Sequence, residues 1–160
     1  MHVAQLNVGR LVGPEDDPRV ADFMAGLDRI NAVAEASPGF VWRLQDDAGN
    51  ATAIKVSDDP RFIVNLSVWE SVEALADFAY RSDHTAFLRR RREFFEPPTE
   101  AILCLWWLPE GDVPTVTEAL DRLDHLRAHG PSPTSFTFRH RYDDVGQPVT
   151  KATDRDACPA

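Results

Sequence analysis

Cysteine is scarce in this chain, whose 160 residues include only Cys104 and Cys158. Two cysteines so far apart make neither a disulfide framework nor the paired spacing of a zinc site. Cys104 lies within an apolar stretch, so we expect it to pack as a small core residue. The small domains that disulfides or a structural zinc ion hold together are therefore excluded.

Long apolar runs are also missing. The longest, residues 101–108, falls well short of the roughly 20 residues that a membrane-spanning helix needs. The first ten residues show no basic segment followed by an apolar one, as a signal peptide would. We therefore expect a protein that is located in the cytoplasm and does not enter a membrane.

Positive charge is in deficit, with 17 lysines and arginines against 26 aspartates and glutamates and a formal net charge of −9. Such an acidic chain has no overall attraction for nucleic acid or for an anionic membrane surface. The local exception is the run Arg89, Arg90, Arg91 and Arg92. We interpret this run as a solvated helix face or a surface for an acidic partner, and not as a nucleic-acid site.

Hydrophobic residues are plentiful by contrast. They make up 43% of the chain, and large ones recur as far as residue 138. A chain of this length buries one continuous core. We expect a single domain over residues 1–142 and a flexible tail over residues 143–160.

Hydrophobic periodicity predicts four main strands and four helices. The strands fall at residues 3–11, 40–45, 61–69 and 101–108, with weaker candidates at 51–56 and 135–139. The helices fall at residues 18–36, 70–81, 82–95 and 116–129, with N-caps at Asp17, Ser82 and Thr115 and a stop at Gly130. This order predicts an α+β, ferredoxin-like split βαβ fold with a C-terminal helical extension. The sheet would be antiparallel, with helices on one face.

Alternation within the strands predicts two unlike faces. One face is apolar and suits the helices. The other combines amides, an arginine and tryptophans: Asn7, Arg43, Asn65, Ser67, Trp69 and Trp106. This mixture favours a ligand cavity, and it would also suit a dimer interface; both hold if two sheets face each other. In a cavity, Trp69 and Trp106 would stack on the substrate, Asn7 and Asn65 would orient its oxygens, and Arg43 would line it.

His84 and Arg91 are the candidate catalytic residues. With Ser82 as N-cap, they lie seven residues apart on one stripe of a continuous helix, among apolar side chains. The positive end of the helix would keep His84 neutral and able to move a proton, while Arg91 would hold an anionic or enolate oxygen. The structural alternative is that His84 bonds a backbone group and Arg91 pairs with an acid such as Glu96.

Other motifs are weaker. Asp121, His125 and His129 follow one another at intervals of four, but no complete ligand set accompanies them. We interpret them as an exposed polar stripe and predict no metal site. Phosphate-binding loops and the GxSxG motif are absent from the sequence.

Three segments carry a family resemblance: QLNVGRL at residues 5–11, VNLSVWESVEALADFAYRSDHTAFLRRRREFF at 64–95, and LWWLPEGDVPTVTEALDRL at 105–123. Residues 3–139 resemble a bacterial family of unknown function that is grouped with the antibiotic-biosynthesis-monooxygenase-like dimeric α+β barrels. The resemblance implies a homodimer whose sheets close into a barrel, with a cavity between sheet and helices in each protomer. The related monooxygenases oxidise aromatic polyketides without metal or flavin, and others of this fold bind haem or catalyse isomerisation or dehydration.

The resemblance and the residues together suggest a small-molecule enzyme. The leading hypothesis is a cofactor-independent monooxygenase, or a related cyclase or isomerase, acting on an aromatic or polyketide-like substrate. One alternative is a haem protein of the same fold with His84 as axial ligand. Another is a non-catalytic ligand-binding or regulatory dimer. The expected partners are a small-molecule ligand and a second copy of the chain.

Overall fold

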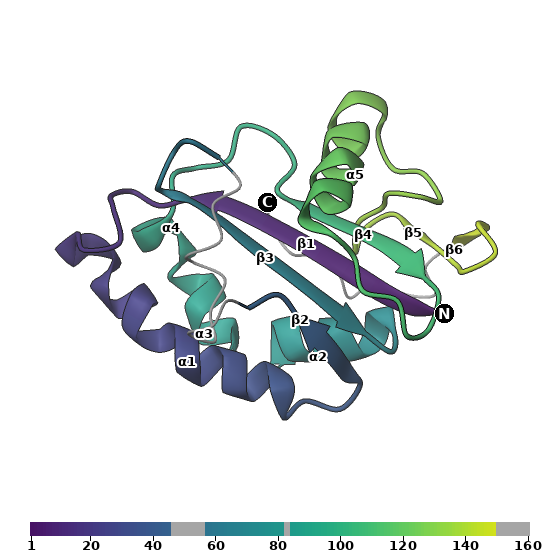
Figure 1. Ribbon diagram of the computed structural model, residues 1–160, viewed down its shortest axis with the longest axis horizontal. Coiled ribbons are helices and arrows are strands. Elements are labelled where there is room, and N and C mark those ends of the chain that lie inside the picture. The colour runs from purple at the N-terminus through teal and green to yellow at the C-terminus, as the bar shows by residue number, and fades with distance from the viewer. Residues whose placement is uncertain (46–56, 82–83, 150–160) are drawn as a thin grey trace.

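A four-stranded antiparallel sheet forms the centre of the computed structural model, which describes residues 1–45, 57–81 and 84–149 and, for His84 and Phe87, only the backbone (Figure 1). The strands lie in the order β2 (Phe40–Arg43), β3 (Phe62–Trp69), β1 (His2–Arg10) and β4 (Leu103–Leu108). The two inner strands, β1 and β3, pair along their length, from Val3 opposite Trp69 to Arg10 opposite Phe62. The predicted α+β fold with an antiparallel sheet is confirmed.

Helices cover both faces of this sheet, not one as the sequence analysis expected (Figure 1). The first face carries η1 (Pro18–Val20), α1 (Ala21–Glu35), α2 (Val72–Arg81) and α4 (Arg91–Phe94), and α3 (His84–Arg89) packs against α1 and α2. The second face carries α5 (Val116–His129). Neither face is bare, so a dimer that buries an uncovered sheet face does not follow from this arrangement.

Three of the predicted helix ends are confirmed. The Asp17 carboxylate accepts a hydrogen bond from the Arg19 amide at 2.8 Å and caps η1, which begins with a proline. The Thr115 hydroxyl accepts one from the Glu118 amide at 3.1 Å at the start of α5. Gly130, with φ of 79°, ends α5 in the left-handed region.

The predicted continuous helix over residues 82–95 is interrupted. Arg90 separates α3 from α4, and Phe95 then adopts an extended backbone that pairs with Leu11 at the end of β1. The local sequence contains neither glycine nor proline, so periodicity alone does not reveal the break. The seven-residue interval from His84 to Arg91 therefore does not run along one unbroken helix. The expected cap at Ser82 and the strand at residues 51–56 lie outside the described residues.

The chain after α5 is more structured than the sequence suggests. The backbones of Leu105 and Phe136 exchange two hydrogen bonds of 2.8 Å, in place of a full strand at residues 135–139. A short hairpin follows, made of β5 (Arg141–Tyr142) and β6 (Pro148–Val149). Residues 143–149, which we expected in a flexible tail, thus belong to this hairpin. None of the helices in the described part has the length and apolar content of a membrane span.

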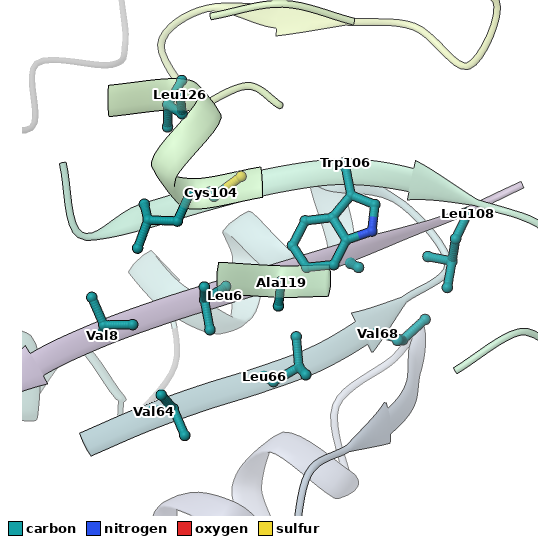
Figure 2. Close-up of a cluster of buried hydrophobic side chains, with 12 residues drawn as sticks. Leu6, Val8, Val64, Leu66, Val68, Cys104, Trp106, Leu108, Ala119 and Leu126 are labelled. Carbon is teal, nitrogen blue, oxygen red and sulfur yellow. The ribbon is translucent and has the colours of Figure 1, made fainter. Parts of the chain in front are cut away.

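The register of β1 with β4 corrects the predicted faces. Ala4 lies opposite Trp106 on one side and Val68 on the other, so Trp106 shares the apolar face that α5 covers (Figure 2). Trp69 shares the other face, because its partner is Val3. Alternation assigns faces within one strand, but only the pairing relates one strand to the next. A register irregularity between Phe40 and Trp42 also places these two aromatics on opposite faces.

Candidate functional site

Polar side chains lie in the middle of the sheet face that α1, α2 and α4 cover. Asn7 is the cross-strand partner of Asn65, and Gln5 is the partner of Ser67. We call these four residues, Gln5, Asn7, Asn65 and Ser67, the polar band. They belong to the two inner strands, where apolar residues normally pack beneath a helical layer.

Two separate apolar clusters border the polar band along the strands. The first, at the Trp69 end, contains Val3, Ala34, Trp69, Val72, Leu75, Leu105 and Phe136. The second, at the Ile63 end, contains Leu11, Val20, Ile63, Phe94 and Phe95. Between them Asn65 is exposed and Asn7 is only half-buried. The helices therefore seal this face at both ends and leave its centre accessible to solvent.

Helix α1 contributes side chains to both clusters. Phe23 and Met24 pack at the Ile63 end, and Ala34 packs at the Trp69 end. Leu27 and Ile30 lie between them on the same helical stripe and are half-buried. Helix α1 thus brings apolar side chains to the sheet face that carries the polar band, and apolar surface beside a few polar groups is typical of a small-molecule site.

Hydrogen bonds occupy one end of the polar band and leave the other end open. The Trp69 indole N–H donates to the Ser67 hydroxyl at 3.0 Å, and this hydroxyl donates to Gln5 Oε1 at 2.9 Å. Within the described part of the chain, the side-chain amides of Asn7 and Asn65 have no such partner. These two amides are therefore available to a ligand.

Arg91 reaches the same face beside the open end of the polar band. Its Nη2 donates to the Val8 carbonyl at 3.2 Å, and its Cζ lies 4.5 Å from the centre of the Phe95 ring. A Cβ placed on Gly9 would come within 3.1 Å of this Nη2. Gly9 and Asn7 are successive residues on one strand face, about 7 Å apart. The guanidinium therefore lies on the sheet face of the two open amides, about one strand repeat along β1 from Asn7.

The charge of Arg91 is not neutralised by a carboxylate in the residues that the structure describes, although the side chain is half-buried. Burial lowers the pKa of Arg91 from its ordinary value, because desolvation disfavours the cation. The acid that the structural alternative named, Glu96, bonds Arg61 at 2.7 Å instead. An unpaired, partly desolvated arginine is typical of an anion-binding site.

The remaining predicted site residues have other surroundings. Arg43 lies on the expected face, where its Nη2 pairs with Glu35 at 2.7 Å. Trp69 is 1% exposed and stacks on Phe78 with ring centroids 5.0 Å apart, so it supports the site from the core. The assignment of Trp106 to the substrate site is wrong, because it is fully buried beneath α5 on the opposite face.

His84 is the first residue of α3, and its side chain lies outside the described part of the structure. Its predicted catalytic role stays a prediction. The sequence reasoning did not single out Gln5, Gly9 or Phe95. An isolated glycine in a strand is a known sign of close approach by another group, and Gly9 carried that signal.

An open groove of about 500 Å³ lies on the other side of the sheet, along α5. Its lining consists of Thr115, Thr117, Glu118, Asp121, Arg122, His125, Thr134 and Ser135. The charge of Arg122 in this groove is already neutralised, because its guanidinium pairs with Glu118 at 2.8 Å. The same guanidinium donates to the Thr134 carbonyl at 2.6 Å. No group of three metal-binding side chains occurs among the described residues. The polar band is thus the better candidate site.

Cys104 packs behind this groove as the core residue that we expected. Its thiol lies 3.2 Å from the Ser135 hydroxyl, which donates to the Arg122 carbonyl at 2.7 Å. Burial raises the pKa of Cys104, so the group stays a thiol and not a thiolate.

Comparison with protein families shows that the model of a domain of unknown function, DUF3291, matches residues 2–152. This match confirms the resemblance to a family of unknown function. No curated protein matches the sequence.

Solved structures of similar fold include SnoaB, a cofactor-independent oxygenase from Streptomyces nogalater, at 18% identity and a TM-score of 0.46. A single-residue variant of that oxygenase matches at 17% identity and a TM-score of 0.47. A proposed antibiotic biosynthesis monooxygenase from Chloroflexus aurantiacus J-10-fl matches at 17% identity and a TM-score of 0.40. Each match covers 71% of this chain and 98% of the other. These likenesses concern the fold and assign no activity.

Proposed function

This chain belongs to the DUF3291 family, whose domain has no assigned function, and we propose that it is a small-molecule enzyme whose substrate carries an anionic oxygen. The observation that carries the proposal is Arg91, a half-buried cation without a carboxylate partner among the described residues, on the sheet face that carries two open amides. A cation kept in this state costs folding free energy, and an anionic ligand would offset that cost.

The substrate we propose is planar, apolar over most of its surface and able to form an enolate or phenolate. Its anionic oxygen would bind Arg91, and a second oxygen would accept hydrogen bonds from Asn7 or Asn65. Its apolar part would lie under Leu27 and Ile30 of α1. An aromatic or polyketide-like molecule has these properties.

The reaction we propose begins with removal of a proton from a carbon next to a carbonyl. Arg91 would stabilise the resulting enolate, an electron-rich species that reacts with molecular oxygen, cyclises or takes up a proton at another carbon. These outcomes correspond to oxygenation, cyclisation and isomerisation, and none of them requires a resident metal or organic cofactor.

We assign the proton transfer to His84. It opens α3, and only Arg90 separates α3 from the helix that carries Arg91. Helix α3 packs on α1 and α2, the helices of the same sheet face. Imidazole is the side chain whose ordinary titration range includes neutral pH, which suits a base that must be regenerated.

Ligand binding tests the first part of this proposal. We would measure the affinity of 2-naphthoate and of its neutral analogue 2-naphthamide by calorimetry. The wild-type protein should prefer the anion, and Arg91→Gln should abolish this preference. Arg92→Gln is the matched control, since it removes the same charge from an exposed neighbour in α4. Equal affinity of the wild type for both probes would contradict the proposal.

Proton transfer is tested separately with 2-tetralone, a ketone whose benzylic α-protons are readily removed to give an enolate. The protein should accelerate exchange of the α-protons for solvent deuterium, followed by proton NMR, and His84→Gln should remove the acceleration. If His84→Gln exchanges as fast as the wild type, another residue is the base. If the wild type gives no acceleration, the chain binds the ligand without catalysing this step.

A further inference from the structure

We infer that Phe95 is a positioning residue for Arg91 and that Gly9 provides the gap into which Phe95 fits. The inference rests on the proposed function, because it concerns how the anion-binding guanidinium is held in place.

The backbone at residue 95 is held by the sheet. Strand β4 pairs with β1 only as far as Asn7. Beyond that point residues 94–96 run beside β1: the Val12 amide donates to the Phe94 carbonyl and the Glu96 amide to the Arg10 carbonyl, each at 2.9 Å. Phe95 is therefore fixed like a strand residue, although it directly follows a helix.

The Phe95 ring occupies the place that a side chain at position 9 would take. A Cβ on Gly9 would lie 2.6 Å from the ring. On its other side the ring packs edge-on against Phe23, with centroids 5.0 Å apart and planes at 82°. Because β1 and Phe23 hold the ring from two sides, it is a rigid surface.

Arg91 lies against this surface. The Phe95 amide donates to the Arg91 carbonyl at 2.9 Å, which places the two side chains one helical turn apart. The guanidinium lies 4.5 Å from the ring centre, and its Nη2 bonds the Val8 carbonyl, which β4 no longer covers. One face and one corner of the guanidinium are thus fixed, while its other N–H groups stay available for an anion.

A neighbouring pair provides the internal comparison. Arg90 lies 4.9 Å from the centre of the Phe94 ring, a contact of the same kind. Arg90 also pairs with Glu93 at 2.8 Å and with Asp22 at 2.9 Å, so its charge is neutralised. Phe94 and Phe95 are both buried in the second cluster, but only Phe95 supports an arginine that is free to bind a ligand. If Phe95 helps to bind the ligand, replacing Phe95 and replacing Phe94 should affect ligand affinity differently. If both rings only pack in the core, the two replacements should affect it similarly.

The experiment compares Phe95→Leu with Phe94→Leu, using 2-naphthoate and 2-naphthamide as probes in calorimetry. Phe95→Leu should weaken binding of the anion about five- to tenfold and leave the neutral probe unchanged, because a positioned cation–π contact is lost. Phe95→Tyr, which keeps an aromatic ring at this position, should bind the anion as tightly as the wild type does. Phe94→Leu should lower the melting temperature similarly and keep the ratio of the two affinities.

The results distinguish the positioning role of Phe95 from the anion site at Arg91. If Phe95→Leu keeps the wild-type ratio while Arg91→Gln abolishes it, the positioning role is wrong and the anion site stands. If Arg91→Gln also keeps the ratio, the anion site itself is wrong. Should Phe95→Leu fail to fold, NMR of the wild-type guanidinium groups replaces it. Adding 2-naphthoate should shift the Arg91 Nε–H signal together with the Phe95 ring signals and leave Arg90 unchanged, and no shift at Phe95 would overturn the inference.

Discussion

Asn7 and Asn65 are direct cross-strand partners at the centre of the sheet, and within the described residues neither side-chain amide has a hydrogen-bond partner. Asparagine is disfavoured in strands, and two of them opposite each other on inner strands do not improve packing. Proteins accept such a local cost mainly at functional sites. The pair is therefore better explained by ligand binding than by folding.

Replacing Asn65 with threonine tests this explanation. Threonine has a high strand propensity and suits an exposed position, so Asn65→Thr should raise the free energy of unfolding by about 0.5 kcal/mol. The same change should weaken 2-naphthoate binding, because an amide donor is removed. Urea denaturation and calorimetry measure the two effects. A variant that is less stable than the wild type would show that Asn65 has a structural role.

Replacing Arg91 with glutamine separates a binding cation from a structural one. The change removes the hydrogen bond to Val8 and the contact with Phe95, but it also removes a desolvated charge without a carboxylate partner among the described residues. We expect the free energy of unfolding to change by less than about 1 kcal/mol. Breaking a buried ion pair would instead cost about 3–5 kcal/mol. A loss of that size in chemical denaturation would assign Arg91 to the fold.

The sequence predicted the strands well because their signal is local. Alternation and β-branched residues mark β1 and β3 directly, and the cap at Thr115 depends on a residue only three positions away. Alternation likewise separated Asn7 and Asn65 from the apolar side chains of their own strands, and the pairing of β1 with β3 places the two asparagines on one face.

The errors concern relationships between distant segments. Trp106 was placed on the wrong face because the sequence of one strand alone does not determine the register of β4 with β1. The break at Arg90 follows from the pairing of Phe95 with Leu11, a contact across more than 80 residues. The position of α5 on the second face likewise depends on which sheet face its apolar stripe meets.

The contact between Gly9 and Phe95 should appear as thermodynamic coupling. Gly9→Ala places a methyl group against the ring and should destabilise the protein by about 1–3 kcal/mol. In a Phe95→Leu background the cost should fall, since the aliphatic side chain can move aside, and we expect a coupling free energy of at least about 1 kcal/mol. Phe94→Leu is the control background, in which the two effects should add. Additivity in both backgrounds would contradict the contact.

The two buried tryptophans should respond differently to replacement by phenylalanine. The Trp69 N–H donates to Ser67, which in turn bonds Gln5, so Trp69→Phe removes a hydrogen bond at one end of the polar band. The Trp106 N–H has no partner among the described residues, and its ring lies under α5 on the opposite face. Trp106→Phe therefore removes packing volume but no hydrogen bond.

We expect Trp69→Phe to weaken 2-naphthoate binding and to lower the free energy of unfolding by about 1–3 kcal/mol, because a buried polar network loses a donor. Trp106→Phe also shrinks a buried ring, so its effect on stability does not discriminate between the two positions. Ligand affinity does discriminate. Trp106→Phe should bind 2-naphthoate within about twofold of the wild type, a change of less than about 0.5 kcal/mol. An equal loss of affinity in both variants would place the ligand on the α5 side of the sheet and contradict the assignment of the site to the polar band.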